Sequence, residues 1–308
     1  MKRILIFGIS GFVGDYLSRL FINKGYEVIG SDLIKNEKVH NSVIFEKGNI
    51  LEPEGVSFII KKYLPDCIVN LAAISSVGQS WNIPQKTIDV NVKGTLNILE
   101  TVKEICIDSK ILLIGSSEEY APSDKPISEN WEINANNPYG ISKMVQEKFA
   151  DMYTERYGMK IVCVRAFNHT GVGQNENFVL PSFCRQIADI NKKNKEGKIY
   201  VGNLSAKRDF SDVRDIIRAY AMIIESEVNH GVFNVGSGKA YAISELLEYI
   251  CSLSEVKITV EVSKERFRNV DTPYICCDNS LMRRKFGWEP EYTIFETIEN
   301  MYKYMLSS

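Results

Sequence analysis

Short apolar runs alternate with longer amphipathic stretches over the first half of the chain. The apolar runs predict strands at residues 4–7, 27–30, 43–45, 67–71, 111–114 and 161–164. The amphipathic stretches predict helices at about 12–23, 53–63, 84–106 and 138–157. Continuous apolar strands separated by helices are typical of a parallel sheet that is covered on both faces. Because crossover connections are right-handed, we expect an α/β fold with a doubly wound parallel sheet of the Rossmann type.

The alternation becomes weaker after about residue 170, where the predicted elements are shorter. The pattern there predicts helices at 179–191, 213–225 and 244–253, with strands at 199–201 and 232–234. We therefore expect a Rossmann-type domain at residues 1–170, which also receives elements near 210–236. A smaller C-terminal region at 171–308 is expected to bind and cover the substrate.

Composition and charge narrow the possible partners. The chain has 308 residues and a formal net charge of −2, so no broad basic surface indicates nucleic-acid binding. No apolar run approaches the roughly 20 residues that cross a bilayer, so no membrane partner is expected. Residues 4–7 are too short for a signal peptide. The seven cysteines are scattered without metal-ligand spacing, which indicates a cytoplasmic protein with reduced thiols, no disulfide framework and no metal.

A glycine-rich turn follows the first predicted strand directly. Its glycines have GxxGxxG spacing, which permits a tight turn and lets backbone N–H groups approach a pyrophosphate at a helix N-terminus. A plain strand–helix turn is the alternative. If the turn binds a dinucleotide, the contacting residues are Gly8, Ser10, Gly11, Phe12, Val13 and Gly14.

Two later strand ends are candidates for binding the adenosine part of such a dinucleotide. Asp32 follows the second strand, where a carboxylate can bind the ribose 2′-hydroxyl and would repel a 2′-phosphate. The sequence therefore favours NAD(H) over NADP(H), with an ordinary loop aspartate as the alternative. Asn49 and Ile50, after the third strand, are placed to meet the adenine edge.

Tyr139 and Lys143 lie four residues apart on a predicted helix, so their side chains project from the same face. The ammonium group can lower the phenol pKa, which is near 10 when unperturbed, and this would allow proton transfer near neutral pH. Ser116 ends an apolar run and is expected at the carboxyl edge of the sheet, where such folds bind ligands. Together with the glycine turn, these residues indicate catalysis more strongly than a surface pair.

Several motifs resemble the extended short-chain dehydrogenase/reductase family. They lie at residues 8–14, 70–73, 91, 115–120 and 139–143. Residues 165–174 and 201–213, with Phe-Asn-His and Arg-Asp-Phe blocks, resemble its GDP-sugar branch more narrowly. The likeness is greatest to GDP-4-keto-6-deoxy-mannose reductases, and GDP-mannose 4,6-dehydratases are also similar. It runs from about residue 2 to about residue 290.

The resemblance implies a role for each catalytic residue and for the neighbouring loops. Tyr139 would exchange a proton with the sugar oxygen at the 4-position, Lys143 would bridge the nicotinamide ribose, and Ser116 would hydrogen-bond the same sugar oxygen. His169 would either touch the cofactor or be a satisfied core histidine. The other cofactor contacts that the resemblance implies are Leu71, Ala72, Ala73 and Asn91.

The resemblance also implies a site for a GDP-sugar. Asn168, Arg208 and Arg268 match residues that bind the diphosphate, and a guanidinium fork suits phosphate geometry. Arg268 starts an Arg-Asn pair where the family usually has Arg-Pro. Asp271 fills the acidic position that the GDP branch uses on the nucleotide. Further substrate contacts implied are Ser75, Ser76, Ser117, Val179 and Asn203.

The presence of Glu118 does not decide which reaction the protein catalyses. In the dehydratases a glutamate at this spacing removes the proton at the sugar 5-position, but the reductases share the same Ser-Ser-Glu-Glu-Tyr sequence. We expect an NAD(P)-dependent oxidoreductase acting at the 4-position of a GDP-linked sugar, either a reductase or a hexose or heptose 4-dehydrogenase. Dehydration and 4-epimerisation are alternatives, and a non-catalytic dinucleotide sensor is a remote one.

A homodimer is implied by the resemblance alone. In the family, two long helices per subunit form a four-helix interface, and here they correspond to residues 91–106 and 138–157. Apolar stripes on single helices usually indicate core packing, so periodicity does not itself predict the dimer.

Overall fold

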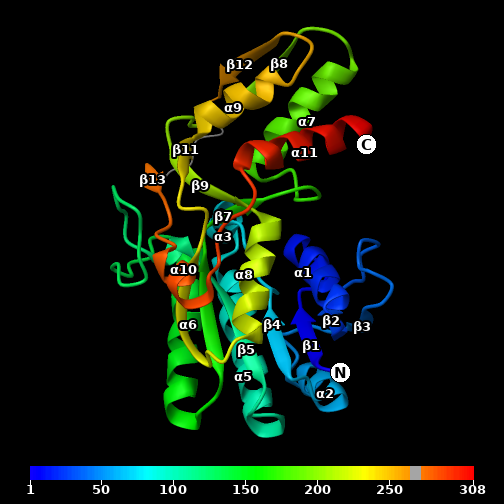
Figure 1. Ribbon diagram of the computed structural model, residues 1–308, viewed down its shortest axis with the longest axis vertical. Coiled ribbons are helices and arrows are strands. Elements are labelled where there is room, and N and C mark those ends of the chain that lie inside the picture. The colour runs from blue at the N-terminus through cyan, green and yellow to red at the C-terminus, as the bar shows by residue number, and fades with distance from the viewer. Residues whose placement is uncertain (264–271) are drawn as a thin grey trace.

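A parallel sheet of seven strands forms the centre of the computed structural model, which describes residues 1–263 and 272–308 (Figure 1). Its strand order is β10-β6-β5-β4-β1-β2-β3, and neighbouring strands are parallel throughout. The strands are β1 (Arg3–Phe7), β2 (Glu27–Asp32), β3 (Ile44–Lys47), β4 (Cys67–Asn70), β5 (Lys110–Ser116), β6 (Ile161–Ala166) and β10 (His230–Val235). The predicted doubly wound sheet is confirmed.

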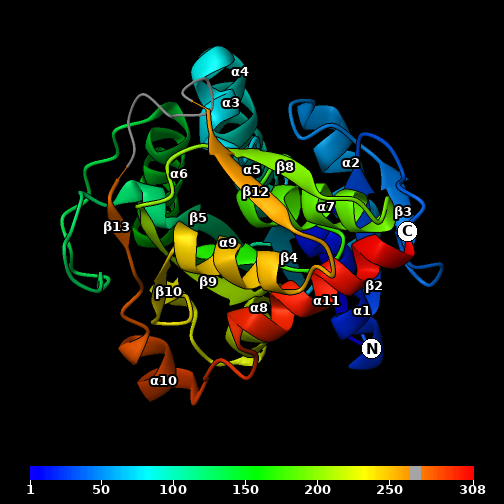
Figure 2. The same ribbon diagram turned by 90° about the horizontal axis from the view of Figure 1, so that it is seen from above.

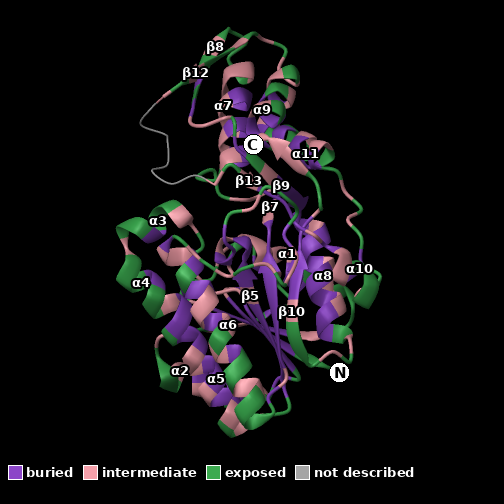
Figure 3. Cartoon of the chain, turned by 90° about the vertical axis from the view of Figure 1, so that its left-hand side faces the viewer, coloured by how far each residue is buried: buried purple, intermediate pink, exposed green. Residues whose placement is uncertain are grey.

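Helices cover both faces of this sheet because successive side chains of a strand point to opposite faces. On β1, Ile4 and Ile6 pack with α1 (Phe12–Asn23) and α8 (Val213–Glu225). Leu5 and Phe7 pack on the other face, with α2 (Pro53–Tyr63), α5 (Gly94–Ile105) and α6 (Pro138–Tyr157). Figure 3 shows the strands buried between helices whose outer residues are exposed. Burying each such side chain contributes about 1.5–3 kcal/mol to folding.

The single helix predicted over residues 84–106 is interrupted. The structure has α4 (Pro84–Ile88), a π-helical turn at Asp89–Lys93, and then α5. Such turns occur where a helix must accommodate one extra residue, often beside a functional site. Here the π-helical turn contains the buried Asn91, whose side chain bonds to a neighbouring loop and to α6. Periodicity could not show this, because an apolar stripe continues through the interruption.

Most elements after residue 166 form a second layer above the carboxyl edge of the sheet (Figures 1 and 2). Its strands make a small sheet in the order β11-β9-β13, with β7 beside β9, and a separate parallel pair, β8 and β12. In contrast, α8 and β10 lie in the layers of the large sheet. The strands are β7 (Asn168–Thr170), β8 (Gly197–Val201), β9 (Lys207–Asp212), β11 (Ala240–Ala242), β12 (Ile258–Val262) and β13 (Tyr274–Ile275). The helices are α7 (Val179–Lys192), α9 (Ile243–Ser252) and α11 (Ile294–Ser307), with α10 (Ser280–Phe286) packing beside β10.

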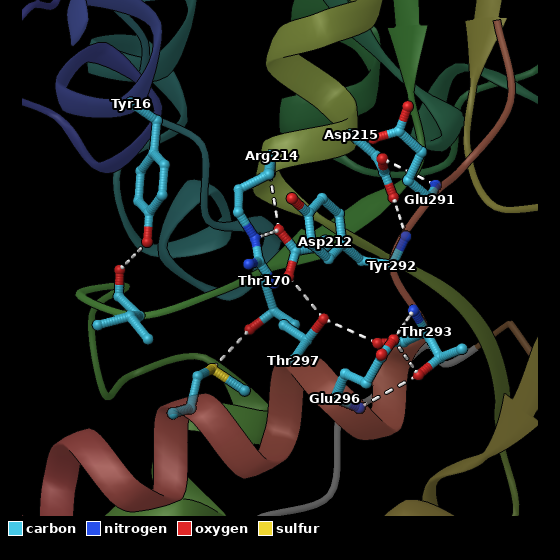
Figure 4. A network of polar contacts seen from close by, with 12 residues as sticks. Tyr16, Thr170, Asp212, Arg214, Asp215, Glu291, Tyr292, Thr293, Glu296 and Thr297 are labelled. Carbon is cyan, nitrogen blue, oxygen red and sulfur yellow. Dashed lines mark hydrogen bonds and ion pairs between the residues drawn. The ribbon is translucent and has the colours of Figure 1, made fainter. Parts of the chain in front are cut away.

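Asp212 joins the two layers at the point where β9 becomes α8 (Figure 4). Its Oδ1 accepts a hydrogen bond of 2.7 Å from the Arg214 backbone N–H, which caps the helix. The Arg214 guanidinium donates one hydrogen bond to each of the two carboxylate oxygens. Thr297, on α11, donates its hydroxyl to Asp212 Oδ2 at 2.7 Å. A buried carboxylate is thus satisfied from both layers, which anchors α11 above the sheet.

Asp215 makes a second connection one turn further along α8. Its two carboxylate oxygens accept the backbone N–H groups of Glu291 and Tyr292, each at 3.0 Å. Burial raises the pKa of Asp215 to about 6. The Tyr292 ring lies 3.6 Å from the Arg214 guanidinium carbon. The segment that leads into α11 is therefore fixed on the first turn of α8.

Thr297→Val tests this anchor. The substitution keeps the shape of the side chain but leaves Asp212 Oδ2 without its buried hydroxyl donor. We expect the free energy of unfolding to fall by about 1–3 kcal/mol, measured by urea denaturation. Ser307→Ala removes an exposed hydroxyl from the same helix and should change it by less than about 0.5 kcal/mol. Equal stability of the two variants would show that the contact does not contribute.

Candidate active site

The glycine turn between β1 and α1 leaves no room for side chains. Gly8 has a φ of +80°, and a Cβ atom there would lie 2.6 Å from the Ala72 nitrogen. A Cβ atom at Gly14 would lie 2.5 Å from the Ile9 carbonyl oxygen. Gly11 is the N-cap of α1 and provides no side-chain cap for the first N–H groups of the helix. These N–H groups are therefore suited to an anionic group such as a pyrophosphate.

Asp32 lies beside this turn, as the sequence predicted. Its carboxylate accepts the backbone N–H groups of Ser10, at 3.0 Å, and Leu33, at 2.8 Å. The Ser10 hydroxyl donates to the Ile34 carbonyl at 2.7 Å. Ser10 therefore connects the glycine turn to the loop after β2, and places the negative charge of Asp32 at the rim of the turn.

Asn49 and Ile50 follow β3 and differ in their surroundings. Ile50 is buried, and its carbonyl accepts the Asn97 side-chain amide at 2.8 Å. The Asn49 side chain bonds locally, accepting the Leu51 N–H at 3.1 Å and donating to Glu52 at 3.2 Å. Ile50 is thus a fixed apolar surface near the sheet edge, while Asn49 stabilises its own turn.

Hydrogen bonds to the sheet and to Asn91 fix the loop after β4. The Leu71 N–H donates to the Phe7 carbonyl at 2.9 Å, which keeps the start of this loop in line with the sheet. The next residues, Ala72 and Ala73, are half-buried. Asn91 accepts the Ile74 N–H at 2.8 Å and donates to the Ser142 hydroxyl at 2.8 Å. Asn91 therefore holds this loop against α6.

Ser116, Tyr139 and Lys143 converge at the end of β5. Ser116 is the last residue of the strand, and its side chain is close enough to that of Tyr139 to lower the pKa of the phenol. Lys143 lies on the same helix as Tyr139, with Nζ 6.0 Å from the centre of the phenol ring. The Lys143 ammonium donates to the Ile114 carbonyl at 2.6 Å. The structure thus brings these three predicted residues together at the end of β5.

The N-terminus of α6 is pinned so that Tyr139 faces Ser116. Asn137 is the N-cap and accepts the Gly140 N–H at 2.9 Å. A Cβ atom at Gly140 would overlap the Glu118 carbonyl oxygen, so the helix touches the backbone of residue 118 directly. Asn137 also donates to Glu118 Oε2 at 2.8 Å. One residue thus orients both Tyr139 and Glu118.

The pKa of Tyr139 moves in the direction opposite to the one predicted from its spacing to Lys143. Burial raises it, the nearby Glu119 and Glu118 carboxylates raise it further, and the hydrogen bond with Ser116 lowers it only in part. Burial also lowers the pKa of Lys143 to about 8. Desolvation outweighs the attraction that the sequence suggested. Tyr139 is therefore protonated at neutral pH.

A small pocket lies beside the residues that follow Ser116. Ser117 and Glu118 line it together with Thr272 and Tyr274. The carboxylate of Glu118 is partly exposed there. The candidate carboxylate base thus lies in a pocket that residues of both layers line.

His169 and Asn168 lie on β7, opposite Ser211 and Phe210 of β9. His169 Nδ1 is 3.1 Å from the Phe167 carbonyl, so this nitrogen carries the proton and Nε2 can act as an acceptor. Burial lowers the pKa of His169, so the ring is neutral. The His169 ring is parallel to the Phe12 ring, with 6.5 Å between their centres. This position beside the glycine turn is compatible with either predicted role.

The other predicted substrate residues lie partly in the second layer and partly in the loop after β4. Arg208 lies on β9, between Tyr241 and Ile275, and donates to the Lys207 carbonyl at 2.9 Å. Ser76 caps α3 (Val77–Asn82), next to the exposed Ser75. Asn203 accepts the Ser205 N–H at 3.0 Å, and Val179 begins α7. Arg268 and Asp271 lie outside the described residues.

Sequence reasoning missed a buried charged cluster directly behind Ser116. Glu119 is fully buried and accepts the Ser116 N–H at 2.6 Å. Arg165 pairs with Glu147 and donates to the Tyr120 hydroxyl at 2.7 Å. An arginine inside the apolar run of β6 was the available signal, because a buried guanidinium requires acidic partners.

It also missed Asp209, the acidic residue of the Arg-Asp-Phe block. Its fully buried carboxylate accepts the N–H groups of Ser237, Gly238 and Cys277. These bonds hold two loops against β9, the strand that carries Arg208. Within residues 1–263 and 272–308, no cluster of three His, Cys, Asp or Glu side chains could bind a metal. In the same part of the chain, no helix has the length and apolarity to cross a membrane.

Comparisons with known proteins agree with this geometry. The family model described as GDP-mannose 4,6 dehydratase matches residues 5–301. GDP-6-deoxy-D-mannose reductase from Pseudomonas aeruginosa is 28% identical over 96% of this chain and 95% of its own. GDP-mannose 4,6-dehydratase from Vibrio cholerae is 26% identical over 97% and 92%. The solved structure of RMD from Pseudomonas aeruginosa complexed with NADPH has a TM-score of 0.84, with 26% identity over 100% and 99%.

Gly140→Ala tests the close approach of α6 to residue 118. The added methyl group would overlap the Glu118 carbonyl, so the start of the helix must shift. We expect the free energy of unfolding to fall by about 1–3 kcal/mol in urea denaturation. Gly55→Ala is the matched control in α2, where a Cβ atom would lie 3.8 Å from its nearest neighbour, Glu52 Cβ. It should raise stability by up to about 1 kcal/mol. A Gly140→Ala protein as stable as this control would contradict the contact.

Proposed function

The chain belongs to the GDP-mannose 4,6 dehydratase family, and from this premise we propose that it is an NAD(P)-dependent oxidoreductase acting at the 4-position of a GDP-linked sugar. The observation that carries the proposal is the convergence of Ser116, Tyr139 and Lys143 at the carboxyl edge of the sheet. Lys143 Nζ lies near the Tyr139 ring, and the glycine turn that leads into α1 is at the same edge of the sheet.

The residues at this edge fit a nicotinamide dinucleotide. The turn at Gly8 and Gly14 brings backbone close to backbone, and the first N–H groups of α1 have no side-chain cap. These groups would hold the pyrophosphate, Asp32 the adenosine ribose, and Lys143 the nicotinamide ribose. The dinucleotide, when bound, supplies or accepts the hydride.

The protonation state of the site supports the reductive direction. Tyr139 is protonated at neutral pH because burial raises its pKa, so its hydroxyl can donate a proton to a 4-keto oxygen. Ser116 would hydrogen-bond the same oxygen and orient it. Lys143, with a pKa of about 8, is mostly charged at pH 7 and stabilises the phenolate that remains after proton transfer. A GDP-4-keto-6-deoxy-mannose reductase activity is therefore the form of the proposal that the geometry supports best.

Dehydration is the second candidate, and one observation favours it. Glu118 lines the small pocket beside residue 117, where a carboxylate could remove a proton from the sugar. Its Oε2 is engaged by Asn137 at 2.8 Å, so it would have to leave that bond or act through Oε1. Because of this hydrogen bond, we rank dehydration below reduction as the proposed reaction. A 4-epimerase would use the same tyrosine and serine, and we rank it below both.

The proposal extends to assembly and compartment. Exposed apolar residues on α6, including Ile141 and Met152, suit pairing of two copies through α5 and α6. We therefore propose a homodimer. All seven cysteines are free thiols, which supports a reducing, cytoplasmic setting.

Tyr139→Phe tests the catalytic assignment. The variant keeps the ring but removes the proton, so kcat should fall by about 10²–10⁴-fold in an assay of hydride transfer. Tyr304→Phe, which changes an exposed tyrosine on α11, should keep the wild-type rate. Wild-type turnover by Tyr139→Phe would overturn the proposed function.

The substrate arm of this experiment separates the candidate reactions. Wild type and Tyr139→Phe would be incubated with GDP-mannose, its 4-keto-6-deoxy derivative and a GDP-heptose, with and without NADH. Product masses are then compared. We expect a gain of two hydrogens on the keto substrate. Loss of water from GDP-mannose would assign the dehydratase instead.

Asp32→Ala tests cofactor choice. We propose that NAD(H) binds better than NADP(H), because a 2′-phosphate would meet the Asp32 carboxylate. The alanine variant should lose most of this preference, measured as the ratio of the two dissociation constants by fluorescence titration. Glu37→Ala removes an exposed carboxylate from the same loop and should leave the ratio unchanged. Tighter binding of NADPH than of NADH by the wild type would refute the preference.

A further inference from the structure

Gln146 is a buried amide on α6, one helical turn beyond Lys143. Its Oε1 accepts a hydrogen bond of 3.3 Å from the Lys143 ammonium, and its Nε2 donates to the Ile114 carbonyl at 3.3 Å. The same carbonyl accepts the Lys143 ammonium at 2.6 Å. The lysine, the glutamine and the backbone of β5 are therefore joined to one another by three hydrogen bonds.

The neighbours of this amide fix its orientation. An ammonium group can only donate and a backbone carbonyl can only accept, so a flipped amide would lose both contacts. On its other side, the Gln146 Oε1 is 3.3 Å from the Thr95 hydroxyl. Thr95 is itself held, since it accepts Asn70 Nδ2 at 3.1 Å and donates to the Asn91 carbonyl at 2.8 Å. The amide oxygen therefore stays directed at Lys143.

The same network reaches a second predicted cofactor contact. The Asn70 Oδ1 accepts the Ala72 N–H at 3.1 Å, while its Nδ2 donates to Thr95. One threonine hydroxyl thus bridges Asn70 and Gln146. Connected groups therefore position both Lys143 and the loop after β4, which are the two parts of the chain expected to meet the dinucleotide near its nicotinamide end.

Lys143 has more donors than the protein uses. Its ammonium carries three N–H groups. Within residues 1–263 and 272–308 these groups donate to two acceptors, the Ile114 carbonyl and Gln146 Oε1. One N–H group is left for a ligand, and its direction is set because the other two are fixed. Since Nζ lies 6.0 Å from the centre of the Tyr139 ring, this donor is near the candidate proton donor.

We propose that Gln146 is a positioning residue of the active site, which holds one N–H group of Lys143 so that another is directed at the nicotinamide ribose. The role rests on the proposed function, because it matters only if Lys143 meets a bound dinucleotide. Without the amide oxygen, the Ile114 carbonyl alone holds the ammonium, which can then rotate about that bond. The ribose loses a directed donor, while the glycine turn and Asp32 still hold the ADP half.

Gln146→Met removes the acceptor and keeps a side chain of similar length. We expect the dissociation constant for NADH, measured by fluorescence titration, to rise by about tenfold, which is about the value of one hydrogen bond to a charged group. ADP lacks the nicotinamide ribose, so its dissociation constant, measured by calorimetry, should change by less than about twofold. A general loss of structure would instead weaken the binding of both ligands.

Gln186→Met is the matched control, because it removes a hydrogen-bonded amide from α7. The Gln186 side chain donates to the Ser182 carbonyl at 3.2 Å and accepts the Tyr200 N–H at 3.4 Å. This variant should keep the wild-type preference for NADH over ADP. Gln146→Glu retains an acceptor oxygen for the ammonium and should also keep the preference, which provides a test if Gln146→Met does not fold.

Lys143→Met separates this proposal from the proposed function. It should reduce the preference for NADH over ADP at least as much as Gln146→Met does. A reduced preference in Lys143→Met with a wild-type preference in Gln146→Met overturns the positioning role and leaves the proposed function standing. So does a reduced preference in Gln146→Glu. Wild-type turnover by Tyr139→Phe, with the preference reduced in both methionine variants, would support the positioning role and refute the proposed function.

Discussion

Desolvation at the carboxyl edge of the parallel sheet is the constraint on which the site depends. It holds the pKa of Tyr139 above its ordinary value and lowers that of Lys143 to about 8. These shifts move the two pKa values apart, so at neutral pH the phenol of Tyr139 holds its proton firmly while the ammonium group of Lys143 holds its own less tightly. The sheet creates this environment because its strands are buried on both faces and all end on one side. The protonation states of the site are therefore consequences of the fold.

The same edge requires backbone segments to approach one another without side chains between them. Gly8 and Gly14 allow this at the glycine turn, and Gly140 allows it where α6 meets residue 118. Gly115 makes room for a carboxyl group instead. Each of these glycines places a functional group, whether the N–H groups of α1, the hydroxyl of Tyr139 or the carboxyl of Glu119. The glycines in these sequence motifs are therefore required by close packing as well as by the chemistry of the site.

The sheet and the meeting of Ser116, Tyr139 and Lys143 could be predicted because they follow from local patterns. Apolar runs fix the strands, helix spacing fixes the shared face, and the family that the motifs indicated is confirmed. The direction of the Tyr139 shift could not be predicted, since it depends on burial by segments distant in sequence. For the same reason Glu119 was passed over: nothing in Ser-Ser-Glu-Glu-Tyr shows which glutamate points inward. The π-helical turn at Asp89–Lys93 was hidden by an apolar stripe that continues through it.

Asn137 links the two candidate reactions in a way that favours one of them. Its Oδ1 accepts the Gly140 N–H and caps the helix of Tyr139, which fixes the orientation of its amide. The NH₂ group must then point toward Glu118, and it donates to Oε2 at 2.8 Å. For this carboxylate oxygen to take up a proton from the sugar, the hydrogen bond from Asn137 would first have to break. The arrangement that makes Tyr139 a well-placed proton donor thus restrains the group that elimination would need, and hydride transfer with proton donation uses the site as it stands.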